Sequence, residues 1–421
     1  MTSTDRDSGG PSRLRERGAS VAVAMAGMNV ATYLFTALAA RLLGPQAYGA
    51  MASLLAVLLV VTMIQLGIQA TAARRISAEP EHVAQIEREI LSLTYWCAGA
   101  VGVLLLVLAP LLDRLLRLDS VATAALVGLT AVPLTIVGGQ LGVLQGERRW
   151  WPVSVVYLAS GVPRLLVGTA LILWRPDEFM AMLGVLIGTI VPALFGWYAL
   201  RIKRPAREHV EHHSRRTLIR EILGNSQTLL AFMCLMNCDV IVARNILPEH
   251  DAGLYAGGLI LTKAMLFLPQ FVVVVAFPAM STAEERRGAL MRGLTLVLGL
   301  GVAGVLASAV LPQLALIFVG GDEYAEIDSR LWLFAVLGTA LSLLQLLIYA
   351  VLARQGTKSV YLVWAALAAV LAIGSQADSL GTLLLTVVTI DSLLFLGLLV
   401  ISLHRLRSPV SDEELPPEAV M

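Results

Sequence analysis

Long apolar runs dominate this sequence and limit how it can fold. Only 14% of its 421 residues are charged, against about 25% in a soluble domain, so most of the chain must be surrounded by lipid. Twelve runs reach the length of about 20 residues that a helix needs to cross a bilayer. The sequence therefore predicts an all-α integral membrane protein with about 12 transmembrane helices, at residues 18–43, 49–72, 91–112, 120–144, 152–174, 179–200, 222–247, 254–280, 293–318, 330–353, 357–376 and 380–403.

A polar stretch at the midpoint divides these helices into two groups of six. We expect residues 18–200 to form an N-terminal lobe and residues 222–403 a C-terminal lobe, joined by a cytoplasmic linker at 201–221. Residues 1–17 and 404–421 are polar, and we expect them to be disordered cytoplasmic tails.

The two halves echo each other. Each opens with a helix, an Ala-Arg pair, a proline turn and a helix that starts with tyrosine, at residues 40–50 and 243–257. Because each half has six spans and both halves start on the same side, the repeat is parallel and its axis is expected along the membrane normal. The halves are therefore predicted to form pseudo-symmetric lobes.

Basic residues gather in alternate loops, which predicts the orientation of the chain. With the N-terminus inside, the inner segments hold 23 of the 31 lysines and arginines and the outer turns hold six. Because basic loops stay in the cytoplasm, both termini are expected there. Arg13, Arg15 and Arg17 precede an apolar run too long for a cleaved signal peptide, so we interpret that run as the first span.

Charged side chains deep within predicted spans are the sharpest candidates for function, because a charge in hydrocarbon costs about 2.5–3.5 kcal/mol or more. Arg164 lies near the middle of its span, and Asp391 is central in the last one. Either residue can instead form a buried ion pair that fixes how helices pack. Asp391, and Asp239 if it is unpaired, are candidates for ion coupling through proton uptake.

The segment at residues 223–279 is predicted to be two helices joined by a polar turn at 248–253. Counted from His250, Asp239 and Lys263 lie at similar depth, within about 3 Å along the helix axis. We therefore expect them to meet across the hairpin, either as a structural pair or in function.

Motifs typical of enzymes do not occur on the segments that face water. His209, His212 and His213 are closely spaced, but a solvated linker explains them better than a metal site. Cys234 and Cys238 have neither redox nor zinc spacing. With a net charge of +1, nothing indicates a nucleic-acid partner. We expect a protein that is not an enzyme and has no cofactor, coupled at most to H⁺ or Na⁺.

Several segments resemble the oligosaccharide flippase family (Wzx-like polysaccharide transporters) of the multidrug/oligosaccharidyl-lipid/polysaccharide (MOP) superfamily. The resemblance covers about residues 20–404. It rests on the two equivalent hairpins and on a glycine–tyrosine turn, with the residues Asn29, Tyr33, Ala40-Arg41-Leu42-Leu43-Gly44-Pro45, Tyr48, Gly49, Arg74, Asp239, Arg244, Gly253, Leu254, Tyr255, Lys263, Pro269, Pro278 and Gly320-Gly321-Asp322-Glu323-Tyr324.

This resemblance implies two six-helix lobes that face each other in a V, with the first, second, seventh and eighth helices lining a cavity. It implies transport of an undecaprenyl-pyrophosphate-linked sugar from the inner to the outer leaflet of a bacterial plasma membrane. The partners would be the bilayer, this substrate and other polysaccharide assembly proteins. The candidates for substrate contact are Arg164, Lys263, Asn29, Tyr33, Gln65, Asn237 and Arg244.

Three other functions stay open. A lipid II flippase typically has fourteen spans and basic residues deep in the first helix, where this chain has Asn29 and Tyr33. A cation-coupled multidrug exporter of the same superfamily favours an acidic cavity, whereas the deep charges here are balanced. A non-transporting scaffold for sugar-assembly enzymes would not close around substrate.

The orientation predicts which turns are accessible from outside the cell. Single cysteines in place of Asp251 and Asp378, in a chain without Cys97, Cys234 and Cys238, should react with an impermeant maleimide in intact cells. Labelling that occurs only after the membrane is permeabilised would show that the orientation is reversed.

Overall fold

The computed structural model describes residues 11–79, 81–118, 120–201, 215–266, 286–352 and 358–407, and these form helices without a strand. Most of the predicted linker and tails, together with Pro269 and Pro278, lie outside this part of the chain. Within it, eight helices are long and apolar enough to cross a membrane. Large apolar side chains such as Val107, Trp174 and Val310 are exposed on their outer faces. The prediction of a multi-pass helical membrane protein is therefore confirmed.

The first lobe consists of α1 (Pro11–Ala78), α2 (Val83–Val107), α3 (Ala109–Leu116), α4 (Val121–Gly146), α5 (Trp150–Trp174) and α6 (Glu178–Leu200). The first two predicted spans are merged in α1 and meet at a kink, where Gly44 has a φ of 71°. Glycine adopts this left-handed conformation without steric cost. Pro45 follows, because the first turn of a helix does not need its missing N–H.

The second lobe consists of α7 (Arg215–Ile246), α8 (Glu249–Met265), α10 (Arg286–Val310), α11 (Pro312–Val319), the 3₁₀ helix η2 (Asp322–Arg330), α12 (Leu331–Leu352), α13 (Lys358–Gly374) and α14 (Leu380–Arg407). The turn between α7 and α8 is shorter than predicted and consists of Leu247 and Pro248. Glu249 and Asp251 belong to the first turn of α8, where acidic side chains favour a helix through its dipole.

A constant shift of 203 residues relates the two lobes. Adding 203 to the bounds of α2, residues 83–107, gives the bounds of α10, residues 286–310. The same shift turns the bounds of α3 into those of α11. Helices α5 and α6 correspond in the same way to α13 and α14. The predicted pair of pseudo-symmetric lobes is confirmed.

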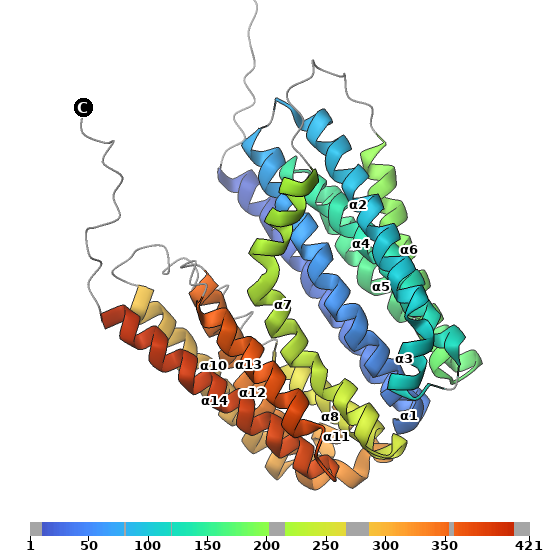
Figure 1. The fold of residues 1–421 in the computed structure, drawn as a ribbon, viewed down its shortest axis with the longest axis vertical. Coiled ribbons are helices and arrows are strands. Elements are labelled where there is room, and N and C mark those ends of the chain that lie inside the picture. The colour runs from blue at the N-terminus through green and yellow to red at the C-terminus, as the bar shows by residue number, and fades with distance from the viewer. Residues whose placement is uncertain are drawn as a thin grey trace, which may run out of the picture.

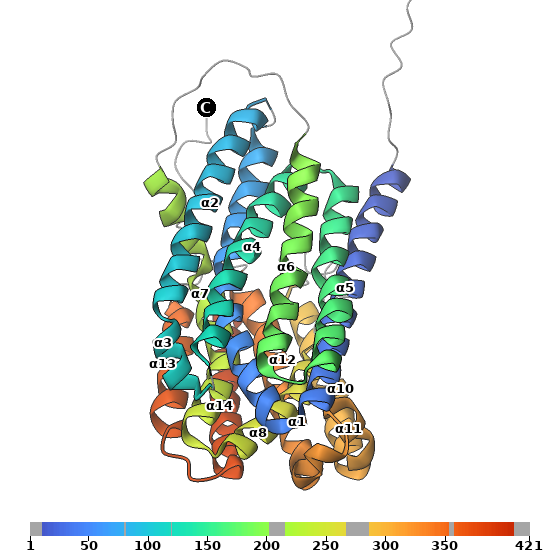
Figure 2. The same cartoon turned by 90° about the vertical axis from the view of Figure 1, so that its right-hand side faces the viewer.

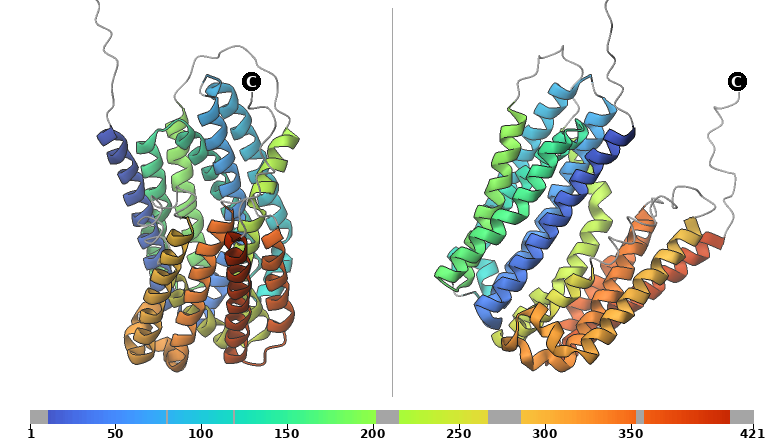
Figure 3. Two further views of the ribbon diagram at one scale, coloured as in Figure 1. Left: turned by 90° about the vertical axis from the view of Figure 1, so that its left-hand side faces the viewer. Right: turned by 180° about the vertical axis from the view of Figure 1, so that it is seen from behind.

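The lobes are arranged as a V (Figures 1 and 3). They converge at the end that holds the turn between α7 and α8, which we call the closed end. They diverge toward the open end, at which α1 begins and α14 ends. Helix α7 runs between the lobes and contacts both α1 and α13. Figure 2 shows α2, α4, α5 and α6 side by side on the outer face of the first lobe.

At the closed end the lobes meet backbone to backbone. A Cβ on Gly49 would lie 2.8 Å from the Cα of Gly253, and a Cβ on Gly253 would lie 1.9 Å from the carbonyl oxygen of Pro45. Gln46 donates a hydrogen bond to the carboxylate of Glu249, and these two residues are equivalent under the repeat. Equivalent residues touch only near a two-fold axis, so the pseudo-two-fold axis passes through this contact.

The glycine–tyrosine turn singled out in the sequence belongs to the same interface. Tyr324 of η2 is fully buried, and its hydroxyl donates to the carbonyl oxygen of Ala40 in α1 at 3.2 Å. Gly257 and Gly320 leave room for its ring, because a Cβ on either would lie within 2.4 Å of a ring carbon. The turn therefore joins the second lobe to the first.

Replacing Gly253 by alanine should loosen the closed end, because overpacking a tight contact costs about 1–3 kcal/mol. With spin labels at Arg114 and Asp378, one in each lobe, the distance distribution should gain a longer component. Gly299→Ala is the matched control, since no atom lies within 4 Å of the added Cβ. An unchanged distribution in Gly253→Ala would show that this contact does not hold the lobes together.

Candidate substrate and ion sites

The buried acid of α7, Asp239, is hydrogen-bonded to a tyrosine of α8. The Tyr255 hydroxyl donates to Asp239 Oδ2 at 2.9 Å, and Oδ1 accepts from the N–H of Val240 at 2.9 Å. Both carboxylate oxygens therefore have a donor, as a buried carboxyl requires.

The position of the turn explains why the sequence did not reveal this partner. Asp239 lies eight residues before Leu247, and Tyr255 lies seven residues after Pro248, so the two side chains are at the same depth. Counting from His250 placed the turn too late and matched Asp239 with a residue about two helical turns further along α8. The proline, which cannot continue a helix, was the signal for the correct position.

Lys263, the residue matched with Asp239 by that count, forms no direct ion pair with it. The two charges interact at longer range. Lys263 is partly exposed, two turns beyond Tyr255 on α8. The predicted coupling between Asp239 and Lys263 is therefore electrostatic, without a shared hydrogen bond.

A second acid lies close to this pair. Asp391 of α14 is 1% exposed, and neither of its carboxylate oxygens has a hydrogen-bond partner among the described residues. It interacts electrostatically with Asp239 across the helix interface. Two buried carboxyls cannot both stay charged at low cost unless a proton or cation joins them. Carboxylate oxygens can bind either a proton or a cation. The described residues contain no cluster of three or more metal-binding side chains.

Arg164 lies between two glycines that hold α5 against α1. A Cβ on Gly161 would meet Met28, and one on Gly168 would meet Phe35, so Arg164 lies at a level between these two residues of α1. Its side chain is partly exposed, and its Nε is buried without a hydrogen-bond partner in the described part of the chain. No acidic side chain described there pairs with it.

The repeat places opposite charges at equivalent positions of the two lobes. Gly188 of α6 lies against the Cα of Arg164. The shift of 203 residues turns Gly188 into Asp391 and Arg164 into Leu367. The same contact between helices thus carries a guanidinium in the first lobe and a carboxyl in the second. The two lobes therefore differ in charge at this helix contact.

Arg244 is buried at the closed end and joins the lobes. Its Nε and Nη2 donate to the carbonyl oxygens of Leu116 and Arg117, at 2.7 and 2.8 Å. These carbonyls end α3, where helix geometry leaves them without partners. In return, Arg117 Nη1 donates to the carbonyl oxygen of Leu247 at 3.1 Å. The geometry assigns Arg244 to the contact between lobes.

The remaining candidates do not gather around a single point. Asn237 is buried in α7 and donates to the carbonyl oxygen of Met233 at 2.9 Å. Gln65 packs against Gly138 of α4, within the first lobe. Asn29 and Tyr33 are partly exposed on α1. Only Asp239, Asp391 and Lys263 are brought close enough for their charges to interact.

The hydrogen bond between Asp239 and Tyr255 should be measurable as a coupling energy. In a double-mutant cycle with Asp239→Asn and Tyr255→Phe, followed by thermal unfolding in detergent, we expect about 1–3 kcal/mol of coupling. The cycle with Asp239→Asn and Lys263→Met should give less, because no direct contact joins that pair. Larger coupling to Lys263 than to Tyr255 would reverse the assignment.

Comparison with known proteins places this architecture. The profile of a family described as polysaccharide biosynthesis protein matches residues 16–284. A search of curated proteins gives no significant match. An inward-facing multidrug resistance MATE transporter of the MOP superfamily has a TM-score of 0.71 and 14% identity, covering 91% of this chain and 98% of that chain.

Two further structures share the fold. An outward-facing MATE transporter of the same superfamily has a TM-score of 0.62 and 13% identity, covering 93% of this chain and 96% of that chain. A MOP superfamily transporter from Pyrococcus furiosus, described as having a binding pocket of reverse polarity, has a TM-score of 0.63 and 15% identity, covering 93% and 96%. Because the family profile spans more than half of the sequence, this chain belongs to the polysaccharide biosynthesis protein family, and its fold is that of the MOP superfamily transporters.

Proposed function

We propose that this protein is an alternating-access flippase for a polyprenyl-pyrophosphate-linked oligosaccharide or a related cell-envelope glycolipid. It would move this substrate from the inner to the outer leaflet of a bacterial plasma membrane. The observation that carries the proposal is the pair of pseudo-symmetric lobes, closed at one end and diverging at the other, in a chain of the polysaccharide biosynthesis protein family. If the lobes opened first at one end and then at the other, a site between them would be exposed to each side of the membrane in turn.

The conformation is consistent with the inward-facing state of such a cycle. The excess of basic residues on the inner segments supports cytoplasmic termini, and α1 begins and α14 ends at the open end. The closed end would then face outward. The higher TM-score to the inward-facing MATE structure than to the outward-facing one agrees with this assignment.

The first lobe would carry the recognition of the substrate's pyrophosphate. A prenyl tail can stay in the bilayer while the head group crosses, so the phosphate charge is the costliest part to move through a low dielectric. Arg164 supplies a permanent, planar donor for phosphate oxygens, without a competing acid among the described residues. Lys263 of α8, in the second lobe, would be the second cation.

The second lobe would couple transport to an ion. Asp239 of α7 and Asp391 of α14 interact electrostatically. A change in how α7 packs against α14 would therefore change the free energy needed to keep both carboxyls ionised. Uptake of H⁺ or Na⁺ would relieve that cost. No other cofactor and no enzymatic step is part of the proposal, and the partners are the bilayer, the substrate and other polysaccharide assembly proteins.

Arg164 variants test the role of the first lobe. In proteoliposomes with a fluorescent polyprenyl-pyrophosphate-linked sugar, the flipping rate should fall from wild type to Arg164→Lys to Arg164→Ala. Lysine keeps a point charge but loses the bidentate geometry, whereas alanine loses both. We expect a loss of about tenfold or more for Arg164→Ala.

Arg175→Ala is the control, because this arginine lies just beyond the other end of α5 and forms an exposed pair with Asp177. It should transport as wild type does. Normal transport by Arg164→Ala, or a fall in its folded-state stability that accounts for the loss of transport, would remove Arg164 from substrate recognition.

Asp391→Asn tests the coupling. This variant should bind the lipid-linked sugar normally but lose acceleration of transport by an ion gradient, by about fivefold or more. The measurement is the flipping rate with and without a proton or sodium gradient, and Asp378→Asn, at an exposed acid before α14, is the control. An unchanged response to both gradients in Asp391→Asn would exclude this residue from coupling.

A further inference from the structure

A groove lies on the outer face of the first lobe, away from the surface that meets the second lobe. It runs between the beginning of α5 and the end of α6 and has a volume of about 610 Å³. Pockets of about 300–1,000 Å³ are the size that holds a small-molecule ligand. The proposed flippase function assigns no role to this groove.

The walls of the groove are apolar, and its rim is aromatic. Val155 and Phe195 line it, one from each helix. Trp151 and Tyr198 stand at its sides and are 76% and 71% exposed. Tryptophan and tyrosine gather at the level of lipid head groups, so this part of the first lobe lies at an interface of the bilayer and its apolar wall faces acyl chains.

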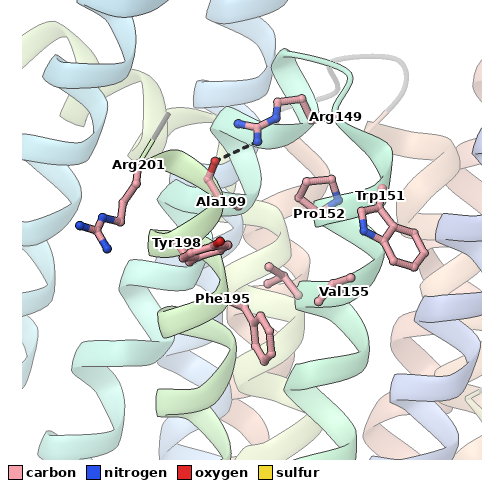
Figure 4. A pocket seen from close by; sticks show the side chains of 9 residues that line it. Arg149, Trp151, Pro152, Val155, Phe195, Tyr198, Ala199 and Arg201 are labelled. Atoms are coloured by element: carbon pink, nitrogen blue, oxygen red, sulfur yellow. Dashed lines mark hydrogen bonds between the residues drawn. The ribbon is translucent and has the colours of Figure 1, made fainter. Parts of the chain in front are cut away.

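Arg149 closes the end of the groove nearest the open end of the V. Figure 4 shows its side chain reaching across from α5 toward α6, above the apolar residues. One Nη2 hydrogen donates to the carbonyl oxygen of Ala199 at 2.9 Å, and Nη1 lies 3.5 Å from Glu147 Oε2. A guanidinium has five N–H donors, and the other three have no hydrogen-bond acceptor among the described residues.

Further positive charge surrounds this end. Arg201 lines the groove, and its guanidinium stacks over the Trp197 ring at 4.5 Å from the centroid, on the side of α6 turned away from Trp151. Arg148 is exposed in the turn before α5. The nearby acid Glu147 is almost fully buried and has a further partner besides Arg149. The positive charge at the end of the groove itself therefore belongs to Arg149, with Arg148 exposed in the adjacent turn.

We propose that this groove binds an anionic glycerophospholipid, with its phosphate at Arg149 and one acyl chain between α5 and α6. An apolar channel that ends in arginines at the interface matches a lipid with a negative head group, whereas a zwitterionic lipid adds a positive charge beside those arginines. With the proposed orientation, the lipid belongs to the cytoplasmic leaflet, where anionic lipids are concentrated. The bound lipid would brace α5, the helix that carries Arg164.

Native mass spectrometry of the full-length protein tests the site, with phosphatidylglycerol and phosphatidylcholine of the same acyl chains as probes. Wild type should retain phosphatidylglycerol about tenfold more strongly. Val155→Trp fills the groove without changing its charge and should lower this binding to the level of phosphatidylcholine. Arg149→Gln should lower it about fivefold, and Arg149→Lys should lower it less. Arg201→Gln should also lower it less, because the Arg201 guanidinium lies on the other side of α6.

Arg292→Gln is the matched control, because Arg292 is an exposed arginine of α10 in the other lobe. It should bind phosphatidylglycerol as wild type does, and melting temperatures should show that every variant compared is folded. Equal retention of the two lipids by wild type, or full binding by Val155→Trp, would overturn the proposal. Displacement of phosphatidylglycerol by an equal concentration of undecaprenyl pyrophosphate would also overturn it, because the groove would then be an entry site for substrate. If Arg164→Ala loses flipping but still binds phosphatidylglycerol, the groove binds lipid independently of substrate recognition by Arg164. The two proposals can therefore fail separately.

Discussion

The contact between backbones at the closed end is the constraint on which the V depends. Gly49, Gly253 and Pro45 approach so closely that no side chain fits between them, and Arg244 completes the contact by satisfying the carbonyls that end α3. The pseudo-two-fold axis passes between the equivalent residues Gln46 and Glu249, and the Arg244 bonds lie to one side of it. Apolar side chains of both lobes, such as Tyr48 and Tyr255, also belong to one continuous buried cluster.

The two lobes share one arrangement of helices but carry different side chains at equivalent positions. Arg41 is the equivalent of Arg244, and it lies beside Gly321 just after α11, as Arg244 lies at the end of α3. Arg41, however, is exposed, whereas Arg244 is 3% exposed. The same divergence separates Arg164 from Leu367 and Gly188 from Asp391. The first lobe thus carries the deep arginine, and the second carries both deep acids together with Lys263.

Both faces of the first lobe take part in this proposed division of roles. The inner side of α5 is held against α1 by Gly161 and Gly168, which positions Arg164. The outer side forms the lipid groove with α6, at the level of the exposed Trp151. Since one helix connects the two sites, a lipid that fills the groove would limit how far α5 can tilt while the lobes rearrange. The membrane would then act on the helix that carries the proposed substrate contact.

The sequence alone determined the spans, the two lobes and the deep charges, because hydrophobic length and buried charge are properties of each segment by itself. It also pointed to the hairpins at Pro45 and Pro248, since proline and glycine act on the local backbone. Only the tertiary structure decided which side chains meet. A turn two residues long set Tyr255, rather than Lys263, beside Asp239, and the crossing of α7 and α14 brought in Asp391. Contacts between helices depend on depth and rotation to within a fraction of a turn, and no pattern within one helix contains that information.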